Sequence, residues 1–132
     1  MTIAEVCKMY GMSADTLRYY EKIGLIDPIE KNQSGRRDYN EGDLNRIGFL
    51  KRMRMAGLSI EALQTYVRLY NEGPQTIPER KELLHNQKEI LEKKIQELID
   101  TKNDLEERIA FYDEFMEKRD YESRIVEKRI EE

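Results

Sequence analysis

The side chains best suited to chemistry lie between residues 16 and 39, where basic, hydroxyl-bearing and aromatic residues gather. Arginine and lysine bind phosphate oxygens, and arginine also forms paired hydrogen bonds with the edge of guanine. Hydroxyl and phenol groups donate hydrogen bonds to bases and phosphates and accept them. The pattern therefore predicts a DNA-binding surface. Its residues are Thr16, Arg18, Tyr19, Tyr20, Lys22, Arg36, Arg37 and Tyr39.

The rest of the sequence shows no arrangement typical of an enzyme or a metal centre. No nucleophile–base pair, carboxylate pair or phosphate-binding loop stands out, so we predict that the chain is not an enzyme and binds no cofactor. The single cysteine, Cys7, excludes an intrachain disulfide and a multi-thiolate metal site within one chain. Cys7 shares an apolar face with Ile3 and Tyr10, which favours inert packing. A redox role for Cys7 is the open alternative.

Two short helices are predicted to position the first of these DNA-binding residues. Apolar residues recur at helical spacing from Ile3 to Tyr10, and Gly11 follows them. Ser13 precedes a run of good helix formers and is typical of an N-cap, and Leu17 is spaced to face inward. Two helices joined by so short a turn containing glycine predict a helix-turn-helix.

The stretch after the second helix is predicted to form a β-hairpin. Turn-forming residues occur at Asp27-Pro28 and at residues 32–35, between short stretches that can extend. Arg36, Arg37 and Tyr39 follow the second turn directly. A short helix followed by a basic hairpin is the pattern of a winged helix-turn-helix, in which the hairpin is the wing.

Three further helices are predicted after the hairpin. Asn40, with Asp43 three residues later, begins the first of them as a capping-box variant, and Ser59 caps the second. Thr76 and Glu79 form a capping box for the third, in which no glycine or proline occurs after Pro78. Apolar residues then recur in heptads, which predicts a coiled coil. Its dimerisation seam consists of Leu84, Leu91, Ile95, Leu98, Leu105, Ile109 and Tyr112.

Nothing else in the chain can cover this seam, so we expect a second copy of the chain to bury it. Lysines at the alternate seam positions favour an antiparallel pair, in which their stems lie over the partner's leucines. We therefore predict a mainly α fold with three parts. Residues 1–73 form a winged helix-turn-helix domain with two following helices, 76–116 form the coiled-coil dimerisation helix, and 117–132 form a short C-terminal helix or a frayed tail.

Charge is distributed unevenly along the 132 residues, whose net charge is −4. Residues 1–60 contain ten Lys/Arg and eight Asp/Glu, a net charge of +2, whereas residues 61–132 contain thirteen and nineteen, a net charge of −6. The positive half contains the predicted DNA-binding residues. Lys51, Arg52 and Arg54 fit either a solvated helix face or an attraction to phosphates. No signal peptide or membrane span is evident, so we expect a cytoplasmic protein.

Three motifs of this sequence resemble the MerR family of bacterial transcription regulators. They are Thr-Leu-Arg-Tyr-Tyr-Glu-Lys-Ile-Gly-Leu at residues 16–25, Gly-Arg-Arg-Asp-Tyr at residues 35–39 and Gly-Leu-Ser-Ile-Glu at residues 57–61. The resemblance implies a winged helix-turn-helix domain followed by a long antiparallel dimerisation helix. It also implies binding to pseudo-palindromic operators in promoters with overlong spacers, where a bound effector lets the regulator bend and untwist the DNA for RNA polymerase.

The same resemblance assigns roles to individual residues. Thr16, Arg18 and Tyr19 match the recognition helix, with Tyr20 at its back near the DNA backbone, and Arg37 and Tyr39 match the wing. Arg36 departs from the family pattern, which has an aromatic residue there. Both consequences stay open: an added phosphate contact, or a change in how the wing packs.

The effector does not follow from the sequence. Metal-sensing members carry cysteines near the end of the dimerisation helix, and aldehyde- and thiol-stress members carry one in the third-helix region, whereas this chain has only Cys7. One candidate for an effector junction combines aromatic residues of two chains, and simple packing of the coil end is its alternative. These residues are Tyr66, Tyr70, Phe111, Phe115, Met116 and Tyr121.

Two other functions fit the sequence: an effector-independent repressor, and a coiled-coil protein whose winged domain docks to other proteins. The operator, the regulated genes and the choice between activation and repression do not follow from the sequence.

Overall fold

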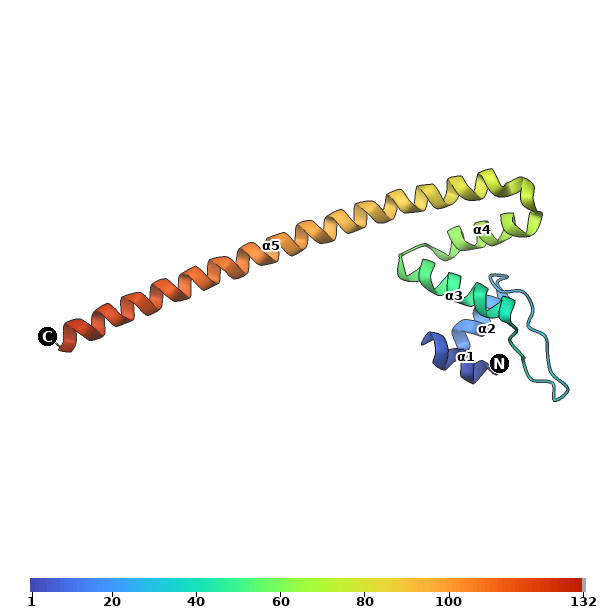
Figure 1. Ribbon diagram of the computed structural model, residues 1–132, viewed down its shortest axis with the longest axis horizontal. Coiled ribbons are helices and arrows are strands. Elements are labelled where there is room, and N and C mark those ends of the chain that lie inside the picture. Colours follow the sequence, from blue (N-terminus) through green and yellow to red (C-terminus); the bar gives the residue numbers. More distant parts are fainter. Residues whose placement is uncertain (132) are drawn as a thin grey trace. The chain divides into compact units, whose positions relative to one another are not determined.

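The computed structural model describes the backbone of residues 1–131 and the side chains of residues 1–125. Its helices are α1 (Ile3–Tyr10), α2 (Ala14–Lys22), α3 (Glu41–Met55), α4 (Ile60–Glu72), the 3-10 helix η1 (Pro74–Thr76) and α5 (Ile77–Glu131), as Figure 1 shows. The chain divides into two compact units, Met1–Leu91 and Glu92–Glu132, and each is described by itself. The predicted mainly α class is confirmed.

Side-chain caps begin the helices where the sequence predicts them. The Ser13 hydroxyl accepts the Thr16 backbone N–H at 3.1 Å, and the Ser59 hydroxyl accepts the Ala62 N–H at 3.1 Å. The Asn40 side chain accepts the N–H of Asp43, which in turn accepts the Asn40 N–H. Each cap satisfies an amide that has no partner within its helix.

The core of the first unit lies under α2, between α1, α3 and α4. Leu17 is fully buried on the inner face of α2, and Tyr20 is 6% exposed beside it. Together they place one side of α2 in the core. The other buried members of this cluster are Val6, Leu25, Ile26, Ile29, Tyr39, Ile47, Leu50, Leu58, Leu63 and Val67.

The wing differs from the predicted β-hairpin, because its two arms form a single antiparallel bridge, between Lys31 and Arg37, and no strand among the described residues. Figure 1 shows it as an extended loop between α2 and α3. Side chains close its tip: the Asn32 amide oxygen accepts the N–H of Ser34 at 3.0 Å and of Arg36 at 3.1 Å. Asparagine and serine favour such local bonds over ladder pairing, which explains the missing strands.

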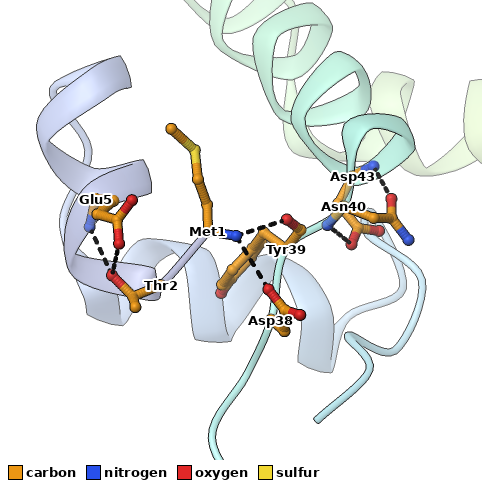
Figure 2. A network of polar contacts seen from close by, with 7 residues as sticks. All are labelled: Met1, Thr2, Glu5, Asp38, Tyr39, Asn40 and Asp43. Carbon is orange, nitrogen blue, oxygen red and sulfur yellow. Dashed lines mark hydrogen bonds and ion pairs between the residues drawn. The ribbon is translucent and has the colours of Figure 1, made fainter. Parts of the chain in front are cut away.

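The wing returns to the core beside the start of α1, where Figure 2 shows a network of polar contacts. The amino group of Met1 donates to Asp38 Oδ1 at 3.0 Å and to the Tyr39 carbonyl oxygen at 3.1 Å. The Tyr39 N–H donates back to the Met1 carbonyl oxygen at 2.8 Å. Because Asn40 follows immediately as the cap of α3, one short segment ties together the wing, α1 and α3.

The start of α5 differs from the predicted capping box. Thr76 is buried, and its hydroxyl donates to the Leu69 carbonyl oxygen at 2.6 Å. The same hydroxyl accepts a hydrogen bond from Arg80 Nε at 3.0 Å. Thr76 therefore joins α4 to the first turn of α5, and no bond from Glu79 to it occurs among the described contacts.

Helix α5 continues without a break to Glu131, past the predicted end of the dimerisation helix at residue 116. The reason is local: residues 117–131 contain no glycine or proline and are rich in glutamate, lysine and arginine, which are good helix formers. Only residue 132 of the predicted tail lies outside the described backbone. Among the described helices, none is both long enough and apolar enough to span a membrane.

We expect the replacement Asn40→Ala to lower the free energy of unfolding by about 1 kcal/mol, because it leaves the Asp43 amide without its cap. Asn40→Asp is the matched control, since aspartate caps helices about as well as asparagine. Urea unfolding followed by circular dichroism measures both variants. Equal losses in the two variants would contradict a capping role.

Candidate nucleic-acid interface

The outward face of α2 is polar and exposed. Its side chains lie three, four and seven residues apart, which places them on one side of the helix, opposite the buried Leu17 and Tyr20. A face of this kind on a short helix can enter the major groove of DNA. The residues of the face are Asp15, Arg18, Tyr19 and Lys22.

Arg18 and Tyr19 are the members of this face best placed to contact bases. The Arg18 guanidinium lies 3.4 Å from the Asp15 carboxylate, with the two side chains 50% and 96% exposed. An ion pair this exposed contributes at most about 1 kcal/mol, so DNA can displace Asp15 from Arg18. The Tyr19 ring is 50% exposed, which leaves its hydroxyl free to reach a base edge or a phosphate.

A hollow of about 360 Å³ opens beside the N-terminus of α2. Thr16 lines it and is half-buried, with its hydroxyl 2.8 Å from the Ser13 hydroxyl. Lys51 and Arg54 line it from α3. The Lys51 ammonium donates to the Tyr10 carbonyl oxygen, and Arg54 Nη1 donates to the Leu58 carbonyl oxygen at 2.7 Å.

From the sequence alone, Lys51 and Arg54 fit either a solvated helix face or an attraction to phosphates, because the sequence does not show what they contact. Their charges are anchored to backbone carbonyls and lie beside the positive end of the α2 dipole. Of the two interpretations, these contacts favour an attraction to phosphate over a solvated helix face. Their spacing of three residues in α3 was the signal in the sequence, since it places both on one helix face.

The wing contributes two arginines, of which one is exposed and one is already paired. Arg36 is exposed near the tip, where it can reach a phosphate. Arg37 Nε donates to Glu21 Oε1 at 3.0 Å, and the two side chains are 32% and 22% exposed. Since Glu21 belongs to α2, this ion pair holds the wing against the recognition helix.

Two of the predicted DNA-binding residues belong to the core instead. Tyr20 is 6% exposed and Tyr39 is 3% exposed. The sequence could not separate them from Tyr19, because residue type alone does not show which side of a helix or loop faces inward. Tyr20 and Tyr39 therefore support the surface from below. Tyr20 also lines the hollow beside the N-terminus of α2, and direct contact of either side chain with DNA stays a prediction.

The Tyr39 hydroxyl is buried and has no hydrogen-bond partner within the described residues. Burial raises the pKa of Tyr39 above its ordinary value, because it disfavours the charged phenolate. The charge of the neighbouring Arg37 lowers the pKa of Tyr39 by a smaller amount. Tyr39 thus stays neutral in the folded protein at physiological pH.

The sequence of this chain matches profiles of a known protein family. The profile described as MerR HTH family regulatory protein matches residues 1–69, and the profile described as MerR, DNA binding matches residues 44–108. The chain belongs to the MerR family. It is a transcriptional regulator of the helix-turn-helix type, as the sequence motifs predicted.

Individual proteins resemble this MerR family member over most of its length. The transcriptional regulator AdhR of Bacillus subtilis is 50% identical over 91 residues, which cover 69% of this chain and 65% of AdhR. A MerR family regulator from Listeria monocytogenes has a similar structure, with a TM-score of 0.80 and 45% identity over 86% of each chain. HiNmlR, a MerR family regulator lacking the sensor domain and solved bound to promoter DNA, has a TM-score of 0.76 and 31% identity, covering 86% of this chain and 90% of that one.

The predicted dimerisation seam of this MerR family member is largely open to solvent in the single chain. Leu84 and Leu91, in the first unit, are half-buried. The members in the second unit are exposed, with Leu98 at 70%. They are Ile95, Leu98, Leu105, Ile109 and Tyr112.

The candidate effector residues fall into both units. Tyr66 and Tyr70 line a hollow in the first unit, whereas Phe111, Phe115, Met116 and Tyr121 are exposed on α5 in the second. Cys7 is half-buried against the core, in keeping with a packing role. Among the described residues, no cluster of three or more histidine, cysteine or carboxylate side chains is arranged to hold a metal ion.

We expect Tyr39→Phe to leave the free energy of unfolding at pH 7 unchanged or to raise it by about 1 kcal/mol, because it removes a buried hydroxyl without a partner. Because the pKa of Tyr39 is raised in the folded protein, ionisation of its phenol opposes folding. The free energy of unfolding is therefore unaffected by this ionisation below about pH 10 and falls as the pH rises further. Urea unfolding at pH 7 and pH 10.5 should therefore show a smaller alkaline loss in Tyr39→Phe than in the parent protein.

Tyr19→Phe is the matched control, since it removes the hydroxyl of an exposed tyrosine. It should leave the stability at pH 7 unchanged. A clear loss of stability at pH 7 in Tyr39→Phe would contradict the assignment of a buried hydroxyl without a partner.

Proposed function

We propose that this chain acts as a homodimer that binds pseudo-palindromic promoter DNA and places α2 of each copy in the major groove. The observation that carries the proposal is the outward face of α2, which is polar while its inner face is fixed in the core. The N-cap at Ser13 and the Glu21–Arg37 ion pair hold this helix and the wing in one orientation. Such preorganisation lowers the entropy lost on binding.

The contacts would divide into two classes. Arg18 and Tyr19 read base edges, because they lie at the centre of the exposed face. Lys22 and Arg36 bind phosphates on either side, and Lys51 with Arg54 binds a phosphate at the N-terminus of α2. Phosphate contacts set the position of the protein, and base contacts set its sequence preference.

A second copy of the chain would bury the exposed seam of α5. Apolar side chains along one stripe, with charged residues on the other faces, are the pattern of a coiled coil. An antiparallel pair would let the Lys102 stem lie over leucines of the partner. Two DNA-binding domains related by a twofold axis then match the symmetry of a palindromic operator.

The known relatives support the same mechanism. HiNmlR shares 31% of its aligned sequence with this chain and was solved on promoter DNA. By analogy, we propose that this regulator binds within promoters and changes the spacer geometry for RNA polymerase. An effector would control this step, and the aromatic residues Phe111, Phe115, Met116 and Tyr121 form the proposed junction with Tyr66 and Tyr70 of the partner.

Two arginine variants test the division of contacts. We expect Arg18→Ala to lower the preference for the operator over unrelated DNA by about 1–3 kcal/mol, since a base contact is lost. Arg36→Ala should weaken binding to both DNAs equally and reduce the slope of log K against log salt by about 1 per subunit. Footprinting on the upstream region of the gene finds the operator, and fluorescence anisotropy at several salt concentrations measures both effects.

Arg68→Ala is the control, because Arg68 is 69% exposed on α4 and pairs only weakly with Glu72 at 4.0 Å. It should change neither quantity. An unchanged footprint and an unchanged preference in Arg18→Ala would rule out α2 as the recognition helix. Failure of the parent protein to protect any DNA at low salt would favour the docking module over the regulator.

The double replacement Leu91→Glu and Leu98→Glu tests the dimerisation seam. Two buried carboxylates per chain would prevent the coiled coil from forming, so we expect monomers and loss of operator binding. The matched control is Gln96→Glu with Asn103→Glu, which adds the same charge about 150° around the helix from the two leucines of the seam. Sedimentation equilibrium measures the mass, and a stable dimer in the seam variant would refute the seam.

Cysteine cross-linking tests the antiparallel orientation of the same seam. In a Cys7→Ser background, cysteines at positions 84 and 105 should form a disulfide between 84 of one chain and 105 of the other. A mixture of two singly substituted chains, analysed by mass spectrometry after oxidation, identifies the pairs. Exclusive pairing of 84 with 84 would show a parallel coil.

A further inference from the structure

A second hollow, of about 350 Å³, lies between α3 and α4 within the first unit. The proposed DNA contacts do not use it, but its Tyr66 and Tyr70 belong to the proposed effector junction, so a ligand bound here would act at that junction. Phe49 and Tyr66 form one wall, with ring centroids 5.3 Å apart and ring planes 31° apart. Its size falls at the lower end of the range for small-molecule sites. The residues that line it are Gly42, Asn45, Arg46, Phe49, Tyr66 and Tyr70.

One guanidinium, that of Arg46, lines this hollow, and a second, that of Arg80, lies near the ring of the lining residue Tyr70. The Arg46 and Arg80 guanidinium carbons each lie 5.2 Å from the centre of the Tyr70 ring. Neither arginine forms an ion pair with a carboxylate among the described side chains, and no lining residue is acidic.

Arg46 keeps donors available for a ligand. A guanidinium has five N–H donors in a planar fork, and Arg46 donates one of them, from Nη1, to the Leu25 carbonyl oxygen at 3.2 Å. Arg80 instead donates hydrogen bonds from Nε to the Thr76 hydroxyl oxygen and from Nη2 to the Gly73 carbonyl oxygen. Arg46 is therefore the side chain that can receive an anionic group, while Arg80 adds its charge.

We propose that the α3–α4 hollow binds a small planar aromatic carboxylate. Its ring would pack against Phe49 and Tyr66, which offer flat apolar surfaces, and its carboxylate would accept paired hydrogen bonds from Arg46. The Asn45 amide supplies a further donor at the rim. A small cation is excluded by the two guanidiniums, and an inorganic anion would leave the aromatic wall unused.

The same arginine connects the hollow to the recognition helix. Leu25, whose carbonyl accepts the Arg46 bond, comes three residues after α2 ends at Lys22. Gln64 of α4 makes a second bond to this segment, through the Ile23 carbonyl oxygen at 3.4 Å. A carboxylate that draws the Arg46 fork toward the hollow changes the support of the α2 exit, and thereby changes DNA affinity. This coupling rests on the proposed function, whereas the binding site does not.

The test uses benzoate as the probe and the full chain without DNA. Saturation-transfer NMR and a titration of chemical shifts measure its binding, with cyclohexanecarboxylate and benzyl alcohol as probes that lack the aromatic ring or the charge. We expect benzoate to bind more tightly than either. Arg46→Lys, which keeps the charge but loses the fork, and Tyr66→Leu, which removes the ring, should each weaken benzoate binding about tenfold or more.

Arg68→Lys is the matched control, since it makes the same change on the exposed part of α4, and it should bind benzoate like the parent. Equal binding of cyclohexanecarboxylate, or unchanged benzoate binding in both Arg46→Lys and Tyr66→Leu, would overturn the proposed site. If those variants instead alter the dimer mass while benzoate does not bind, the hollow is covered by the partner chain and the proposal fails.

The coupling has its own readout. Addition of benzoate should change the affinity for operator DNA at least about threefold in the parent and not in Arg46→Lys, by a measurement of anisotropy. Benzoate binding without any change in DNA affinity would overturn the coupling and leave the site intact. Absence of DNA binding by the parent protein would count against the proposed function, and the NMR result would still decide the site.

Discussion

Helix α2 contains nine residues, and isolated helices shorter than about 12 residues are marginal in water. Its conformation therefore depends on the burial of Leu17 and Tyr20, and burying a leucine contributes about 1.5–3 kcal/mol. Because tertiary packing of the inner face stabilises the helix, the side chains of the outer face need not stabilise it and are available to contact DNA.

The wing depends on the same packing. One antiparallel bridge is too little to hold a two-armed loop, since even a complete two-stranded hairpin is marginal alone. Its geometry is supplied from outside, by the Glu21–Arg37 ion pair on α2 and by the buried Tyr39 ring at its base. Wing and recognition helix thus form one mechanical unit. A change that displaces α2 also displaces the wing.

Local features of the fold followed from the sequence, and contacts across the fold did not. The caps at Ser13, Asn40 and Ser59 were predictable because a cap needs only a side-chain oxygen and an amide three residues away. The motif at residues 16–25 identified the family. The burial of Tyr20 and Tyr39 could not be predicted, because it is decided by segments distant in the sequence.

The other differences have physical causes of the same kind. Local hydrogen bonds accepted by the Asn32 side chain limit strand pairing in the wing to one bridge, which alternation of residues cannot reveal. The long helix continues past residue 116 because glutamate, lysine and arginine favour helix, although a dense charge pattern also fits a frayed tail. The α3–α4 hollow depends on how Arg46 and Arg80 approach one ring, and that is a tertiary property.

The division of charge explains how an acidic chain can bind DNA. Affinity for a duplex depends on the cations that displace counterions locally, and not on the net charge of the whole protein. Residues 1–60 have a net charge of +2, whereas residues 61–132 have a net charge of −6. The acidic surface of α5 repels the DNA backbone, so it disfavours binding along the long helix. The apolar stripe of α5 would be covered by a second copy, while its carboxylates stay in solvent.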